Sequence, residues 1–256
     1  MKTVRTVADL RDAIVPARSG ALGLVPTMGA FHDGHRSLFL AARGECDTVV
    51  VSLFVNPAQF EEGADLEAYP RDLETDALSA EAAGVDILFA PSAAELYPHG
   101  FQTWVDVVEH GHLLEGALRP GHFRGVATIC LKLFNLVRPA FAYFGQKDAQ
   151  QVAVLQRMIR DLNLELTLRV LPTIRDPDGL ALSSRNVRLS AGERKLALAL
   201  PRALATRNQE RARAALAHLD VDYVEVLDLD PPVLAAAIRV GSTRLIDNVV
   251  LEEEPA

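Results

Sequence analysis

Residues 48–55 read Thr-Val-Val-Val-Ser-Leu-Phe-Val and carry the strongest strand signal in the chain. β-Branched and aromatic residues dominate this run, and such residues favour extended backbone. Polar and apolar positions do not alternate along it, which predicts a strand buried on both faces. Strands of this kind occur in parallel sheets that helices cover on both sides. The stretch therefore predicts an α/β fold.

Shorter apolar runs on either side of this stretch predict further strands of the same sheet. They lie at residues 21–25, 85–89, 103–108, 141–144 and 165–171. Helical patterns separate these strands. The first begins at a capping box at Thr6 and ends at Gly20, and the second ends at Arg43. Further helical patterns lie at residues 72–83, 125–137 and 148–162. Strands that alternate with helices predict βαβ units and a mostly parallel sheet. This alternation continues to about residue 182.

The remaining residues follow a different pattern. Ser190-Ala191-Gly192-Glu193 is a second capping-box signature, and a long segment rich in Ala, Leu and Arg after it predicts a helix. Residues 221–227 and 243–251 are typical of strands, and residues 232–239 of a helix. We therefore predict a parallel-sheet domain at residues 1–186 and a small α+β domain at residues 187–256. The terminal LEEEPA predicts a solvated tail.

Composition excludes several classes of protein. The chain has 256 residues, of which 49% are apolar and 23% charged, a balance typical of globular rather than disordered proteins. Its net charge of −8 disfavours nucleic-acid binding, because phosphates need a basic surface. Cys46 and Cys130 lie in apolar runs and predict buried free thiols. No signal-like segment or membrane span is evident, so we expect a soluble, cytosolic protein.

The loop after the first predicted buried strand carries the sequence PTMGAFHDGH, residues 26–35. His32 and His35 flank Gly34 where a helix is predicted to begin. A helix N-terminus offers backbone N–H groups and a positive dipole end to a phosphate, and imidazoles add directed donors. Two surface histidines in a turn are one alternative. A zinc site is another, but no further Cys/His cluster accompanies it.

Two more polar clusters follow predicted strands, where ligands of open parallel sheets bind. Asn56 and Gln59 follow the central strand and can bind carboxylates or hydroxyls of a small polar ligand. The alternative is a turn set by the Asn-Pro pair. Lys147, between Gln146 and Asp148, can pair with a phosphate, and an ordinary capped helix is the alternative.

The fourth cluster, DGLALSSRN at residues 178–186, contains two hydroxyls and a guanidinium, those of Ser183, Ser184 and Arg185. This set suits a polyphosphate, and a polar linker is the alternative. The four clusters show no obvious nucleophile–base pair. Nucleotidyl transfer needs none, because it works by positioning an attacking oxygen and stabilising phosphate charge. The clusters together favour an ATP-dependent enzyme over a hydrolase with a covalent intermediate.

Motifs along nearly the whole chain resemble the pantoate–β-alanine ligase family. They are PTMGAFHDGH, VSLFVNPAQF, YPRDL, EGALRPGHFRGV, FGQKDAQQ, DGLALSSRN and RLIDN, in this order. The HxGH part alone indicates only a superfamily of nucleotidyltransferases and class I aminoacyl-tRNA synthetases, whereas FVNPxQF with FGxKDxQQ is far more specific. The resemblance implies a Rossmann-like N-terminal domain and a smaller C-terminal lid.

The resemblance also implies a reaction in two steps. The carboxylate of pantoate attacks the α-phosphate of ATP, giving pantoyl adenylate and pyrophosphate. β-Alanine then attacks the activated carbonyl, giving pantothenate and AMP. Mg²⁺ is expected to accompany the ATP phosphates without a fixed protein ligand. A cytoplasmic homodimer is expected.

The resemblance implies roles for residues at matching positions. Phosphate contacts and transition-state stabilisation are implied for His32, His35, Lys147, Ser183, Ser184 and Arg185, the last three as counterpart of the KMSKS loop in related enzymes. Further ATP contacts are implied for Met28, Gly29, Gly145, Asp148 and Ile174. Among these, Gly145 and Asp148 are expected to contact the ribose. The adenine is expected to contact backbone groups of Lys147 and Ile174. Pantoate binding is implied for Met28, Gln59 and Gln151, and the β-alanine or adenylate side for Asn56. For Arg119, His122 and Arg124, ordering a loop and serving an interface both stay open.

The chain departs from the family pattern between about residues 207 and 222, which look trimmed, so we expect a shortened lid. Two other functions remain open. A nucleotidyltransferase with another acceptor, such as a phosphorylated alcohol, gives no reason for Gln59 and Gln151 together. A nucleotide-sensing or scaffold module predicts loss of the phosphate-binding residues, and the sequence shows no such loss.

Overall fold

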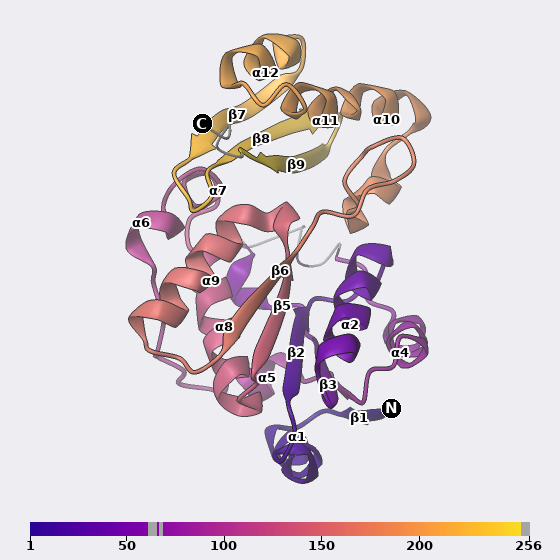
Figure 1. Cartoon of the computed structure of the whole chain (residues 1–256), viewed down its shortest axis with the longest axis vertical. Coiled ribbons are helices and arrows are strands. Elements are labelled where there is room, and N and C mark those ends of the chain that lie inside the picture. The colour runs from indigo at the N-terminus through magenta and orange to yellow at the C-terminus, as the bar shows by residue number, and fades with distance from the viewer. Residues whose placement is uncertain (61–65, 67–68, 252–256) are drawn as a thin grey trace. The chain divides into compact units, whose positions relative to one another are not determined.

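In the computed structural model, which describes residues 1–60, 66 and 69–251, the chain packs into two units (Figure 1). The first comprises Met1–Phe144 and Gln150–Leu171, and the second comprises Gly145–Ala149 and the chain from Pro172 onward. The boundary predicted between residues 186 and 187 therefore lies within the second unit. Leu180, which precedes the predicted boundary, is buried in the core of the second unit.

A six-stranded sheet forms the centre of the first unit, in the order β1-β4-β3-β2-β5-β6. The strands are Lys2–Val4, Leu22–Thr27, Thr48–Leu53, Ile87–Phe89, Phe141–Gly145 and Thr167–Leu171 for β1 to β6. The pairs β1–β4, β4–β3, β3–β2 and β2–β5 are parallel. The order reverses between β2 and β5, the switch point at which Rossmann-like sheets bind ligands. The predicted α/β fold with a parallel sheet is confirmed.

Helices cover both faces of this sheet, as residues 48–55 predicted (Figure 1). On β3, Val50 enters one core, whereas Val49 and Val51 enter the core on the opposite face. Helices α1 (Val7–Ile14), α8 (His122–Val137) and α9 (Ala149–Asp161) contribute to the first of these cores, and α2 (Asp33–Glu45) and α4 (Leu73–Ala82) to the second. Full burial of each such aliphatic side chain stabilises the fold by about 1.5–3 kcal/mol.

Short helices connect the larger elements of the first unit. They are the single-turn η1 (Val15–Ala17) and η2 (Pro57–Gln59), and the short α5 (Ala93–Leu96), α6 (Val108–Gly111) and α7 (Glu115–Leu118). The predicted capping box at the start of α1 is present in part: Thr6 Oγ1 accepts the N–H of Asp9 at 3.0 Å. The helix ends before Gly20, because Pro16 begins the tighter turn η1.

The strand predicted at residues 103–108 was wrong. Val105 and Val107 pack against the first core at alternate positions, which produces a strand-like pattern. The N–H of Val105 donates to Thr128 Oγ1 of α8 at 3.0 Å, rather than to a neighbouring strand. The alternation therefore reflects packing of an extended segment on a helix and not pairing in a sheet.

The second unit contains an antiparallel sheet of β7 (Asp220–Leu227), β8 (Val233–Val240) and β9 (Thr243–Val250). Helices α10 (Ala191–Ala197), α11 (Ala199–Leu204) and α12 (Gln209–Leu216) pack in the same core, which confirms the small α+β fold. Two single-turn helices, η3 (Gln146–Asp148) and η4 (Ser184–Arg188), belong to this unit.

Two predictions for the second unit need correction. The helix predicted at residues 232–239 is strand β8, which pairs with both β7 and β9 and is almost wholly buried. Helix propensity differs among ordinary residues by less than about 0.7 kcal/mol each, so burial and pairing on both sides outweigh it. The long helix after Ser190 is divided into α10 and α11, because Pro201 cannot donate to the carbonyl of Ala197.

Cys46 and Cys130 are buried free thiols, as predicted. Among the described residues, no helix has the length and apolar character needed to span a bilayer. The predicted tail falls mostly on residues 252–256, outside the described part of the chain.

Candidate active site

The loop between β2 and α2 follows an unusual backbone path. Gly29 has φ +91° and Ala30 has φ +54°, both in the left-handed region. The buried carboxylate of Asp76 on α4 accepts the N–H of Ala30 at 2.8 Å and that of Phe31 at 2.7 Å. These two bonds stabilise the turn, from which the chain enters α2 at His32.

His32 and His35 satisfy the N-terminus of α2 with their own side chains. His32 Nδ1 accepts the N–H of Gly34 at 3.1 Å, and His35 Nδ1 accepts the N–H of His32 at 3.3 Å. The two ring centroids lie 4.2 Å apart. A ring nitrogen that accepts a hydrogen bond carries no proton, so each neutral imidazole carries its proton on Nε2. Two N–H donors beside the positive end of a helix are well suited to bind phosphate oxygens.

Asn56 and Gln59 lie at the start and end of the turn after β3. Asn56 is 1% exposed; its Nδ2 donates to Gln59 Oε1 at 3.0 Å and to the Gly125 carbonyl at 3.1 Å. Its Oδ1 accepts the N–H of Ala58 at 3.2 Å. Gln59 Nε2 in turn donates to Met28 Sδ at 3.0 Å. The predicted pantoate-binding residues Met28 and Gln59 are thus in contact, and Asn56 orients Gln59.

Arg119 and His122 contact the backbone of the same turn. His122 Nδ1 lies 2.8 Å from the carbonyl oxygen of Gln59, and Arg119 Nη2 donates to that oxygen at 3.4 Å. The guanidinium of Arg124 instead lies 4.8 Å from the centre of the Trp104 ring. Of the three residues whose roles the sequence left open, Arg119 and His122 therefore contact the backbone of the segment that carries Gln59.

Gln151 lies in the first turn of α9 and is partly buried. Its neighbour Gln150 is buried and donates to the carbonyls of His110 and Leu113, at 2.8 and 2.7 Å. Gln150 also accepts the N–H of Glu115 at 3.1 Å. Gln150 thereby fixes the start of the EGALRPGHFRGV segment, a role that its sequence neighbours did not indicate.

In the second unit, the segment Gly145–Ala149 carries Lys147. The Lys147 side chain is 19% exposed, and its Nζ lies 3.5 Å from Asp148 Oδ1. A methyl group added at Gly145 would meet no atom within 4 Å, and Gly145 has φ −91°, which any residue adopts. Neither packing nor backbone conformation thus requires glycine here, and the space beside it is open to a ligand.

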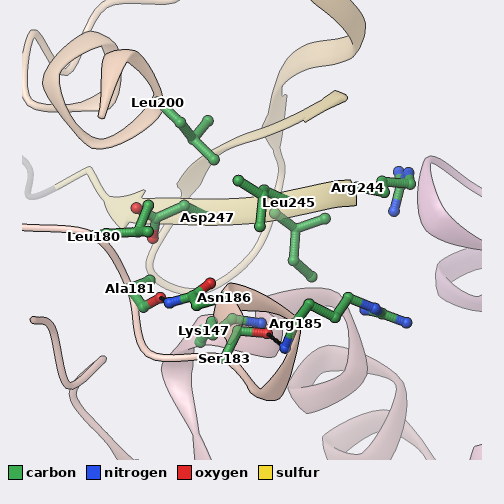
Figure 2. A pocket seen from close by; sticks show the side chains of 11 residues that line it. Lys147, Leu180, Ala181, Ser183, Arg185, Asn186, Leu200, Arg244, Leu245 and Asp247 are labelled. Carbon is green, nitrogen blue, oxygen red and sulfur yellow. Dashed lines mark hydrogen bonds between the residues drawn. The ribbon is translucent and has the colours of Figure 1, made fainter. Parts of the chain in front are cut away.

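A pocket in the second unit brings Lys147 together with Ser183 and Arg185, and Leu245 and Asp247 of β9 line it as well (Figure 2). Ser183 Oγ accepts the N–H of Arg185 at 3.3 Å and begins η4. The pocket therefore holds an ammonium, two guanidiniums (the second from Arg244), a hydroxyl and the carboxylate of Asp247, and its excess of cations suits phosphate oxygens.

Ser184 and Ile174 are not among the described residues that line this pocket. Ser184 is the first residue of η4. Ile174 is 37% exposed, and its carbonyl accepts the N–H of Leu182 at 2.9 Å. The loop that carries Ile174 is thereby joined to the segment that leads to Ser183.

The family model for pantoate-beta-alanine ligase matches residues 2–250 of the chain. The chain belongs to the pantoate–beta-alanine ligase family. Pantothenate synthetases of Heliobacterium modesticaldum and Roseiflexus castenholzii are 51% and 49% identical to it. The matches cover 97% and 98% of this chain and 100% of each relative. These alignments extend over 280 and 278 positions, more than the 256 residues of the chain, so they contain gaps in this chain.

Solved structures of family members have the same fold. The crystal structure of pantothenate synthetase from Thermus thermophilus is 44% identical, with a TM-score of 0.92, and the match covers 98% of this chain and 99% of that one. The ligase from Francisella tularensis is 33% identical, with a TM-score of 0.86 and coverage of 98% and 97%. That crystal structure is described as a complex with beta-gamma ATP and beta-alanine. The resemblance drawn from the motifs is confirmed.

Asp76 is a ligase residue that the sequence motifs did not single out. We expect Asp76→Asn to lower the free energy of unfolding by about 1.5–3 kcal/mol, because one part-buried N–H of the Ala30–Phe31 turn then faces an amide N–H. Activity should fall with the loss of order at His32. Chemical denaturation and steady-state kinetics measure both effects. The control is Asp72→Asn at the N-cap of the same helix α4, where asparagine caps equally well, and this variant should keep both properties. If the two variants have the same free energy of unfolding and the same activity, Asp76 has no role in the site.

Proposed function

We propose that this chain catalyses the ATP-dependent condensation of pantoate with β-alanine to form pantothenate, AMP and pyrophosphate. The family match over residues 2–250 carries this proposal. The geometry of each unit agrees with it: the first holds paired imidazole donors and an ordered amide, and the second holds a cationic pocket.

In the first step, an oxygen of the pantoate carboxylate forms a bond to the α-phosphorus of ATP. The bond between that phosphorus and the bridging oxygen breaks, and pyrophosphate leaves. We assign the Nε2–H groups of His32 and His35 to phosphate oxygens, where they stabilise charge as it develops. Lys147 and Arg185 contribute positive charge, and the hydroxyls of Ser183 and Ser184 donate hydrogen bonds. No side chain has to act as a nucleophile.

Three further contacts of ATP follow from matching positions. We assign Gly145 and Asp148 to the ribose, and the open space beside Gly145 supports this assignment. The adenine is assigned to backbone groups of Lys147 and Ile174. Gly29 and Met28 are assigned to ATP on the side of the paired histidines, where the left-handed backbone of Gly29 lets the chain turn without a side chain.

In the second step, the amine of β-alanine attacks the acyl carbon of pantoyl adenylate. The amide bond forms, the bond from that carbon to the phosphate oxygen breaks, and the amine releases a proton. Gln59, Gln151 and Met28 are assigned to pantoate. Asn56 was expected on the β-alanine side, but the three hydrogen bonds of its side chain support a role through Gln59 instead.

Magnesium is assigned to the bound nucleotide. Within residues 1–60, 66 and 69–251, no group of three or more His, Cys, Asp or Glu side chains is placed to hold a metal ion. The assignment rests on the resemblance and on the general preference of Mg²⁺ for phosphate oxygens. When bound, the ion offsets phosphate charge. The homodimer, the cytoplasmic location and the lid role of residues 187–256 remain predictions.

Pantoate-dependent release of pyrophosphate tests the first step. The purified chain is mixed with ATP, Mg²⁺ and pantoate without β-alanine, at enzyme concentrations close to those of ATP. We expect about one pyrophosphate per active chain. Release with phosphorylated alcohols but not with pantoate would favour the alternative acceptor class. No release with any acceptor, followed by no pantothenate when β-alanine is added, would contradict the proposal.

Gln59→Ala should impair the use of pantoate more than that of ATP. A hydrogen bond to a charged group contributes about 1.5–3 kcal/mol, so KM for pantoate should rise about 10- to 150-fold while KM for ATP stays within about twofold. Steady-state kinetics with one substrate varied at a time measure both constants. Gln156→Ala, at an exposed position of α9, is the control and should change neither. An unchanged KM and kcat for pantoate would remove Gln59 from the site.

A further inference from the structure

We propose that Asn248, the last residue of the RLIDN motif, is a positioning residue that holds the ATP-binding segment Gly145–Ala149 through the backbone of Lys147. This assignment rests on the proposed function and names a part of its ATP site that the matching positions leave without a role.

Asn248 lies on β9 and is 5% exposed. Its Nδ2 donates to the carbonyl of Gln146 at 2.9 Å and to the carbonyl of Lys147 at 2.8 Å. Its Oδ1 accepts a hydrogen bond from Gln146 Nε2 at 3.2 Å. One buried side chain thus makes three hydrogen bonds to two consecutive residues of the segment.

The two carbonyl bonds act on both sides of one Cα atom. The carbonyl of Gln146 belongs to the peptide plane before Lys147, and the carbonyl of Lys147 belongs to the plane after it. Because the two planes are held by the same amide, the φ and ψ angles of Lys147 are fixed. Those angles set the direction in which the Lys147 side chain leaves the backbone.

Asp247, the residue before Asn248, holds the loop that leads to Ser183 in the same pocket. Asp247 is 2% exposed and accepts two hydrogen bonds from Arg175, at 2.7 and 3.0 Å. Arg175 also donates to the carbonyl of Gly179 at 3.2 Å, in the loop that precedes Ser183. Consecutive residues of β9 therefore hold the segment that carries Lys147 and the loop that leads to Ser183 and Arg185.

The geometry indicates a role in catalysis beyond stability. The segment is covalently joined to β5 and α9 of the first unit, yet it packs with the second unit. Between β5 and α9 lie only the three residues of η3, and Asn248 makes its hydrogen bonds to two of them. A displacement of about 1 Å in a positioning group costs about 100-fold in rate.

Asn248→Asp tests the assignment with almost no change in size. The aspartate retains an acceptor for Gln146 but loses both donors to the carbonyls. We expect KM for ATP to rise about 10- to 100-fold, while KM for pantoate stays within about twofold. Hydrogen exchange should become faster at the amides of residues 145–149 and stay unchanged in β7 and β8.

Gln209→Glu is the matched control, since it makes the same change from amide to acid in the same unit. Gln209 Nε2 donates to the Val224 carbonyl at 3.0 Å and to Glu225 at 2.8 Å, and neither partner belongs to the ATP site. This variant should lose stability without a change in KM for ATP. If Asn248→Asp unfolds, Asn248→Ala repeats the test without adding a charge.

A rise in KM for ATP no larger than that of Gln209→Glu, or unchanged exchange at residues 145–149, would overturn the role of Asn248. Failure of the proposed function is a separate result, because the wild-type chain would then form no pantothenate. In that case, exchange at residues 145–149 and equilibrium binding of a non-hydrolysable ATP analogue still compare Asn248→Asp with its control. Equal binding of the analogue by both variants would overturn the assignment.

Discussion

His35→Asn is expected to fold like the wild-type chain and to lose about 100- to 1,000-fold in kcat/KM for adenylation. The asparagine oxygen takes the place of Nδ1 and can accept the N–H of His32, so the N-terminus of α2 remains capped. The N–H donor that His35 carries on Nε2 is lost. Removing one preorganised donor to a transition state costs about this much in rate.

His35→Gln provides the matched test. Glutamine at N3 of a capping box accepts the backbone N–H of the N-cap residue, and its longer side chain also places an amide N–H near the position of Nε2. We expect it to retain more activity than His35→Asn and to keep a stability close to that of the wild-type chain. Pyrophosphate release and denaturation curves measure the two properties. If activity instead follows stability across the two variants, His35 serves only as a helix cap.

Lys147→Met is expected to lower kcat/KM for ATP by about 100-fold or more. Methionine has nearly the length of lysine but no charge, and the ammonium lies in the pocket with Ser183 and Arg185. The loss of stability should be small, because the Asp148 partner is 46% exposed and surface ion pairs contribute at most about 1 kcal/mol.

The control for this variant is Lys195→Met, at an exposed position of α10 in the same unit. It removes the same charge from the chain and should leave KM for ATP within about twofold. Kinetics at several ionic strengths separate the two cases, since a general effect of net charge is screened by salt. Equal losses in both variants would show that Lys147 acts only through net charge.

Most of the first unit could be predicted from its sequence because local signals and tertiary packing agree there. The apolar run at residues 48–53 is buried on both faces, and the capping residue Thr6 begins a helix where expected. Strand β8 could not be predicted in this way. Its alanines favour a helix locally, and only pairing with β7 and β9 makes the segment extended.

The residues of the candidate site also fall into two groups, those that the local sequence indicates and those that only tertiary contacts reveal. His32, Gln59, Lys147 and Ser183 lie in motifs whose chemistry can be read from neighbouring residues. Asp76 could not be found in this way, because its partners lie 45 and 46 residues earlier in the chain. Asn248 binds residues 101 and 102 positions away, and only its place in RLIDN drew attention to it. Residues that hold a site through backbone bonds leave little trace in local sequence.

The central claim is tested most directly by assaying AMP and pantothenate from the purified chain with ATP, Mg²⁺, pantoate and β-alanine, and omitting each component in turn. We predict equal amounts of the two products, and no pantothenate when pantoate, β-alanine or ATP is absent. No pantothenate from the complete mixture, together with pyrophosphate release when pantoate alone is added, would show that the first step is intact and that the amine differs. No turnover with the complete mixture, from a chain with a cooperative melting transition, would contradict the account.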